Sequence, residues 1–239
     1  MPIKKRTASG WGDKGWADDC EKEPDSALSE PKLLSIKGFA KFFNQPLYAD
    51  VKIYLGQDEL PAHCLMIASQ SEYFARALEG NFVEGEKKEI RFTEGSMQAH
   101  WRVFEFMYTG EYSEDPHPGL SALDDDILTK HVRVYALADM FLMENLQKHA
   151  LKKFESTIRE QWVHEEFPNC VREIYESTPE NNRGLRDIVL NTTREHLSEL
   201  WEKTDFKGLV SNGGDFVVDL IGSLVTSKRT FPTTKTFHF

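Results

Sequence analysis

The stretch ADVKIYLGQDELPAH, residues 49–63, decides the fold class, because the periodicity of the chain changes there. Apolar residues alternate with other residues from Ala49 to Leu55, which is the two-residue repeat of a half-buried strand. A short turn over 56–58 then leads into a returning strand over 59–63. So short a connection cannot hold a crossover helix, which excludes a doubly wound sheet.

The sequence around this hairpin follows helical spacing. Before it, the apolar residues of 33–43 recur with the period of a helix. After it, Ser69 and Glu72 have the spacing of a capping box, which predicts that a helix opens there and carries Tyr73 and Phe74 on its apolar face. The first half of the chain is therefore expected to be an α+β unit.

A third strand and a longer helix complete this unit. The pattern predicts a brief strand over 88–93 and then a helix that Ser96 caps and Gly110 ends. An acidic segment over 111–126 follows, and its three aspartates at 124–126 lack the alternating ligand spacing of an EF-hand loop. We interpret this segment as a solvated loop, with a calcium site as the alternative.

Beyond residue 126 nearly every apolar pattern is helical. The predicted helices lie around 128–138, 146–154, 168–175, 185–201 and 215–225. The chain thus divides into an arm over 1–31, an α+β core over 32–125, a helical extension over 126–225 and a flexible tail over 226–239. The arm has almost no aliphatic side chains to offset the entropy of ordering it, so we expect it to be disordered.

Composition narrows the function classes. Lys and Arg number 29 against 39 Asp and Glu, giving a net charge of −10, which disfavours binding to a phosphate backbone. No apolar run approaches the roughly 18 residues that span a bilayer, and the N-terminus has no apolar stretch of the kind found in secretory signals. Three scattered cysteines argue against a disulfide framework. We expect an intracellular protein of the cytoplasm, the nucleus or both, without direct nucleic-acid or membrane contact.

Catalytic patterns are missing from the sequence. No histidine has metal-ligand spacing to a cysteine or to another histidine, and there is no glycine-rich phosphate loop. His63 and Cys64 are adjacent, so their side chains diverge and a Cys–His nucleophile pair is disfavoured. We predict a protein that is not an enzyme and has no catalytic residues, no metal and no cofactor.

The motifs of the first half, taken in register, resemble those of the BTB/POZ domain family over residues 33–154. The matching positions are Asp50, His63, Tyr73, Phe74, Tyr108 and Gly110. The resemblance implies a small sheet flanked by a helical cluster. The helical remainder resembles the extension of fungal BTB proteins and the BACK-type helices of adaptor proteins.

The resemblance also implies roles for individual residues. Asp50 and His63 are signature positions, which we interpret as architectural, with ligand contact as the alternative. Because they lie on two strands joined by a tight turn, we expect the Asp50 carboxylate to hold the orientation of the His63 imidazole.

Members of this family commonly self-associate, and the N-terminal helix would supply the apolar face of a homodimer here. The candidate interface residues are Leu33, Ile36, Phe39 and Phe43. The alternative is that the same helix packs within its own molecule.

Adaptor members of the family carry a hydrophobic–x–Glu motif that contacts a cullin, and Phe82 and Glu84 match it. Phe82 would anchor in a pocket of the cullin while Glu84 adds charge complementarity. The alternative is that Phe82 fills the domain's own core.

The resulting hypothesis is a homodimeric, non-enzymatic interaction module that links substrates to a cullin ubiquitin ligase as an adaptor. Substrate would be held by the helical extension or by the arm, where Trp11 and Trp16 are possible docking residues. The alternative is a nuclear scaffold of transcription or chromatin that acts through recruited partners and enters through the basic run at 4–6.

Overall fold

The computed structural model describes residues 38–79, 83–123 and 125–227. Several predicted features lie outside these residues. They are the arm with Trp11 and Trp16, the basic run at 4–6, Leu33, Ile36 and Phe82, and the segment 228–239.

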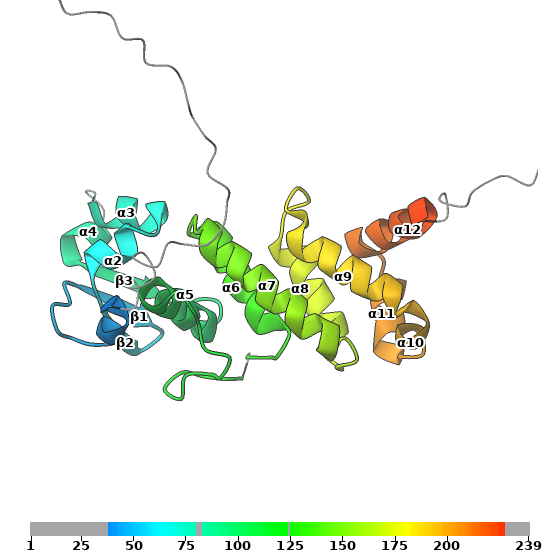
Figure 1. The fold of residues 1–239 in the computed structure, drawn as a ribbon, viewed down its shortest axis with the longest axis horizontal. Helices are drawn as coiled ribbons and strands as arrows, with labels where there is room; N and C mark the ends of the chain where they lie inside the picture. Colours follow the sequence, from blue (N-terminus) through cyan, green and yellow to red (C-terminus); the bar gives the residue numbers. More distant parts are fainter. Residues whose placement is uncertain (1–37, 80–82, 124, 228–239) are drawn as a thin grey trace, which may run out of the picture.

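A three-stranded sheet lies at one end of the described part of the molecule (Figure 1). Strands β1 (Val51–Leu55) and β2 (Asp58–Ala62) pair antiparallel, which confirms the predicted hairpin. Strand β3 (Glu89–Phe92) pairs parallel to β1 on its other edge, giving the order β2-β1-β3. The apolar residues of β1 are buried, as expected for the side of a strand that faces the core.

The connection from β2 to β3, which lie on opposite edges of β1, is helical. It contains α2 (Cys64–Ala68), α3 (Glu72–Glu79) and α4 (Val83–Lys87). Before the sheet, Gly38 and Phe39 are helical and lead into the 3₁₀ turn η1 (Ala40–Phe42), so the described part of the predicted N-terminal helix is a single short turn.

The capping box that Ser69 and Glu72 predicted is wrong in register. Ser69 stands at the C-terminal end of α2, where its hydroxyl donates to the Met66 carbonyl at 3.0 Å. Ser71 caps α3 instead, because its oxygen accepts the backbone N–H of Phe74 at 3.3 Å. The extra helix α2, which the sequence interpretation missed, takes Ser69 out of the capping position.

Helix α5 (Met97–Thr109) packs against β1 and α2 and has the predicted ends. The Ser96 hydroxyl accepts the backbone N–H of Ala99 at 3.2 Å. Gly110 ends the helix in the left-handed region at φ 74°, which glycine adopts without steric cost.

Most of the acidic segment after α5 is exposed, as predicted for a solvated loop, but the Asp125 side chain is buried, which corrects the prediction at this residue. The Asp125 carboxylate receives both terminal nitrogens of Arg102, at 2.5 and 2.7 Å, and these side chains are only 3% and 1% exposed. Glu114 pairs with Lys130 and Lys153, and Asp126 accepts the first backbone N–H groups of the next helix. Among the described residues, no group of three or more acidic, His or Cys side chains could hold a metal ion.

Seven helices fill the rest of the described chain and extend in a row from the sheet (Figure 1). They are α6 (Thr129–Met140), α7 (Glu144–Gln161), α8 (Phe167–Ser177), α9 (Arg183–Glu195), α10 (Leu197–Trp201), α11 (Thr204–Ser211) and α12 (Asp215–Ser227). Helix α6 packs against α5, α7 and α8, so it joins the two halves through one continuous apolar core.

The single helix predicted over 185–201 is two helices. The chain leaves helical geometry at His196, whose φ is −114° and ψ 23°. The imidazole of His196 stacks on the indole of Trp162 with ring centres 3.8 Å apart and planes 6° apart. In the last helix, Phe216 and Leu220 are buried, while Ile221 is exposed.

No single helix within the described ranges combines the length and apolar character that a bilayer crossing requires. The pair formed by α11 and α12 passes that test only jointly, and it bends by 97°.

Candidate protein-interaction surfaces

A partly buried set of hydrogen bonds fixes His63 at the point where β2 ends and α2 begins. Its Nε2 lies 2.9 Å from the Leu47 carbonyl, which can only accept, so Nε2 carries the proton. Its Nδ1 then accepts from the Tyr108 hydroxyl at 2.8 Å, and the same hydroxyl accepts the backbone N–H of His63 at 2.9 Å. Burial raises the pKa of Tyr108 to about 12, so the hydroxyl keeps the proton that it donates.

Asp50 does not hold the His63 imidazole, which corrects the expectation. Its Oδ1 accepts the backbone N–H of Cys64 at 2.6 Å, the first residue of α2. A carboxylate at the beginning of a helix satisfies one of its unpaired N–H groups and interacts favourably with the helix dipole. Asp50 and His63 therefore act on the same junction, each through a different partner.

An exposed apolar surface surrounds this junction; we call it the N-terminal apolar surface. Its members are Phe39, Leu47, Tyr48 and Leu65, which are 41%, 58%, 77% and 78% exposed. Two of them are joined through Phe42, whose ring lies 6.5 Å from Phe39 and 6.3 Å from Tyr48. The Phe42 ring also lies 5.8 Å from His63, whose Nε2 contacts the Leu47 carbonyl. Leu65 follows His63 on the first turn of α2.

The two described candidates for a dimer interface behave differently. Phe39 belongs to the N-terminal apolar surface. Phe43 packs inward, with its ring edge against Trp101 at 4.9 Å and its centre 5.7 Å from the ring of Tyr108. The intramolecular alternative thus describes Phe43, while Phe39 is available to a partner.

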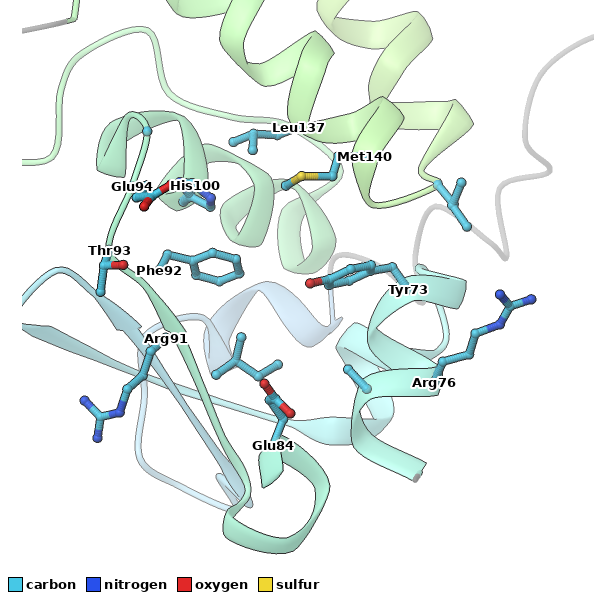
Figure 2. A pocket seen from close by; sticks show the side chains of 14 residues that line it. Tyr73, Arg76, Glu84, Arg91, Phe92, Thr93, Glu94, His100, Leu137 and Met140 are labelled. Atoms are coloured by element: carbon cyan, nitrogen blue, oxygen red, sulfur yellow. The ribbon is translucent and has the colours of Figure 1, made fainter. Parts of the chain in front are cut away.

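A groove of about 770 Å³ lies between α3, α4, β3 and the end of α6 (Figure 2). Figure 2 shows Tyr73 and Glu84 pointing into the groove, while Arg76 and Arg91 point outward on its two sides. Phe92 lines the floor and packs against His100, with ring centres 4.3 Å apart and planes tilted by 34°. Burial lowers the pKa of His100, so this imidazole is neutral at physiological pH.

The signature residues divide between the core and these surfaces. Phe74, Tyr108 and Gly110 are structural: two rings are buried and the glycine ends α5. Tyr73 is partly exposed in the groove. Sequence reasoning missed Leu47, Tyr48, Leu65, Arg76 and Arg91, because a single exposed side chain in a turn or on a helix carries no periodic signal.

The site has binding groups and no activated nucleophile. Burial raises the pKa of the half-buried Cys64 thiol, and the nearby Asp50 carboxylate raises it further. Such a thiol is protonated at neutral pH and is a poor nucleophile. The arrangement can bind polypeptides through apolar and charged contacts.

Comparisons with known proteins agree with this description. A family model of the BTB/POZ domain matches residues 39–158. Mouse Kelch-like protein 1 is 31% identical over 90 residues, covering 37% of this chain and 12% of that protein. Human Kelch repeat and BTB domain-containing protein 3 is 24% identical over 190 residues, covering 78% of this chain and 28% of that protein.

Two further relatives match most of their own length. A putative BTB/POZ domain-containing protein of Arabidopsis thaliana is 23% identical over 212 residues, covering 85% of this chain and 94% of that protein. The solved BTB domain of zebrafish PATZ1 is 17% identical with a TM-score of 0.40, covering 56% of this chain and 99% of that domain. By contrast, this chain spans only 12–28% of the length of the mouse and human relatives named above.

The predicted resemblance to fungal members and the domain boundary at 125 stay predictions. The family match covers half of the chain, and it includes the sheet, the hydrogen-bonded His63 and helices α2 to α6. The chain therefore belongs to the BTB/POZ family of protein-interaction domains, with a small sheet flanked by helices and an all-helical region after it.

Proposed function

We propose that this protein is a homodimeric, non-enzymatic BTB adaptor that presents bound proteins to a cullin ubiquitin ligase. The observation that carries the proposal is the N-terminal apolar surface. Four large apolar side chains gathered around one junction are unusual on a monomer, and such patches typically mark contacts with other proteins.

The backbone at Tyr48 also supports a binding role for this surface. Its φ is 62°, which lies in the left-handed region. The left-handed conformation costs a residue with a Cβ atom roughly 1–2 kcal/mol. The turn that holds it is closed by the Ala49 N–H, which donates to the Pro46 carbonyl at 3.1 Å. A strained turn that directs an aromatic ring outward is typical of a site whose role is binding.

Sedimentation velocity at micromolar concentrations tests the homodimer. We expect a dimer for the wild type and a monomer for Tyr48→Glu and for Leu65→Glu, because a charge would be buried in the interface without a partner. Val163→Glu is the control, since Val163 is also an exposed apolar side chain but lies between α7 and α8. A wild type that is monomeric throughout would refute the proposal.

The cullin contact is supported by Glu84, the described member of the hydrophobic–x–Glu motif. Its carboxylate is exposed on α4 and borders the groove of Figure 2, so a partner that inserts an apolar side chain there would also meet a negative charge. Phe82, the other member of the motif, lies outside the described residues.

A pull-down with a cullin N-terminal domain tests this contact. Glu84→Ala and Phe82→Ala are each expected to weaken capture at least tenfold, whereas Glu86→Ala is expected to leave it unchanged. Glu86 is the appropriate control because it is exposed on the same short helix and has the same charge. If all three variants are captured as well as the wild type, the motif assignment is contradicted, and the homodimer proposal stays intact.

A further inference from the structure

Helix α12 has an apolar face that the described chain covers on one side only. Phe216 and Leu220 are buried, and the helix packs against α8 and α9. Val218, Ile221 and Val225 remain 70%, 56% and 52% exposed. A helix that is apolar around most of its circumference is normally buried around most of it, so this face calls for an occupant.

The uncovered face borders a hollow of about 530 Å³ between α10, α11 and α12. Its lining includes Leu197, Trp201, Phe206, Val217, Leu220 and Ile221. Trp201 is half exposed within it. The hollow has room for a few large side chains and offers them aromatic and aliphatic contacts.

One carboxylate lines this hollow, that of Glu202, and two more are exposed on the helices that form it. Glu199, Glu202 and Asp205 are exposed on α10, α11 and the turn between them. Of the two lysines nearby, Lys203 donates to a backbone carbonyl of the α7–α8 connection, and Lys207 lies over the Trp201 ring at 5.9 Å. The surface therefore favours an occupant that combines aromatic groups with positive charge.

The twelve residues that follow α12, KRTFPTTKTFHF at 228–239, have this composition. They contain Phe231, Phe237 and Phe239, three Lys or Arg residues and no Asp or Glu. We propose that this segment folds back onto the hollow, with the rings of Phe237 and Phe239 in it and its basic residues toward Glu202.

Length and tethering agree with this occupant. Twelve extended residues reach about 40 Å, whereas the thirteen residues of α12 span about 20 Å, so the segment can reverse and still cover the hollow. Because the segment is attached to α12, its effective concentration at the hollow is in the millimolar range. A second copy of the chain fits less well, because a stable dimer buries roughly 800 Å² on each partner, whereas this hollow has room for only a few large side chains.

Disulfide trapping in the full chain tests the proposal, with Cys20→Ser and Cys64→Ser removing the other reactive thiols. Ile221→Cys with Phe239→Cys should form an intramolecular disulfide under mild oxidation, identified by peptide mass spectrometry. Gly222→Cys with Phe239→Cys is the matched control. Position 222 is the next residue of α12, is exposed, and has open space for a side chain, but it faces 100° away. We expect the first pair to link at least tenfold faster.

Equal linking rates for the two pairs would overturn the proposal. A disulfide between two molecules through position 221 would also overturn it, in favour of a second copy on the hollow. Hydrogen exchange gives an independent readout: Phe237→Ser with Phe239→Ser should speed exchange of amides over 217–224 several-fold, and the control Thr233→Ser should not. Unchanged exchange in the double variant would likewise overturn it.

Discussion

Removing the Asp125 carboxylate is expected to destabilise the BTB domain severely, although it lies in a segment rich in acidic residues. The variant Asp125→Ala leaves the Arg102 guanidinium buried without its counterion. The guanidinium keeps only the backbone carbonyls of Ser113 and Glu114, at 2.8 and 3.2 Å. Breaking one side of a buried ion pair costs about 3–5 kcal/mol, because the remaining charge stays desolvated.

For a chain of this size that loss corresponds to a fall in Tm of roughly 6–20 °C, measured by differential scanning calorimetry or by circular dichroism. Asp125→Asn should lose less, about 1–3 kcal/mol, because the amide keeps an acceptor oxygen but not the charge. Replacing both partners, Arg102→Leu with Asp125→Leu, should recover part of the loss, since no charge then remains buried.

The matched control is Asp115→Ala, which removes an exposed carboxylate from the same segment. Its effect on the free energy of unfolding should stay within about 0.5 kcal/mol. If Asp125→Ala costs no more than Asp115→Ala in urea unfolding, the pair does not hold the segment, and the reasoning from burial is wrong.

Two further expectations concern buried side chains. Burial lowers the pKa of His131 to about 4. Between pH 6.5 and 4 the unfolded chain therefore binds a proton that the folded chain does not. The wild type loses stability as the pH falls through this range, by a total on the order of 3 kcal/mol. His131→Gln should flatten this dependence in urea unfolding at pH 4.5 and 7, and an unchanged slope would contradict it. Tyr108→Phe removes the hydroxyl that serves both the backbone and the ring of His63, and should cost about 1–3 kcal/mol; a loss below 0.5 kcal/mol would show that these hydrogen bonds are not stabilising.

Local rules were enough to predict the hairpin, the ends of α5 and most helices. The alternation in β1 and the caps Ser96 and Gly110 depend on residues close to one another in the sequence, so the pattern contains the information. The capping box failed for the same reason. Ser69 and Glu72 have the correct spacing, but helix α2 ends at Ser69, and five residues are too few for the sequence pattern to reveal that helix.

Features that depend on distant partners could not be predicted in this way. Arg102 and Asp125 are 23 residues apart, and an isolated run of aspartates is usually solvated. The only local signal is that Arg102 lies directly between Trp101 and Val103 in an apolar stretch. The break at His196 is similar, because its stacking partner Trp162 is 34 residues earlier and the apolar spacing continues through the break.

The placement of the two proposed sites makes their tests independent. Helix α2 carries Leu65 of the N-terminal apolar surface and lies beside the sheet, whereas α12 lies at the far end of the row of helices (Figure 1). A two-fold dimer formed through the first surface would place both copies of α12 away from the interface. Distant sites without shared partners contribute additively to the free energy. Tyr48→Glu should therefore abolish the dimer without changing the trapping rate between positions 221 and 239, and a rate that falls with dimerisation would show that the two surfaces are coupled.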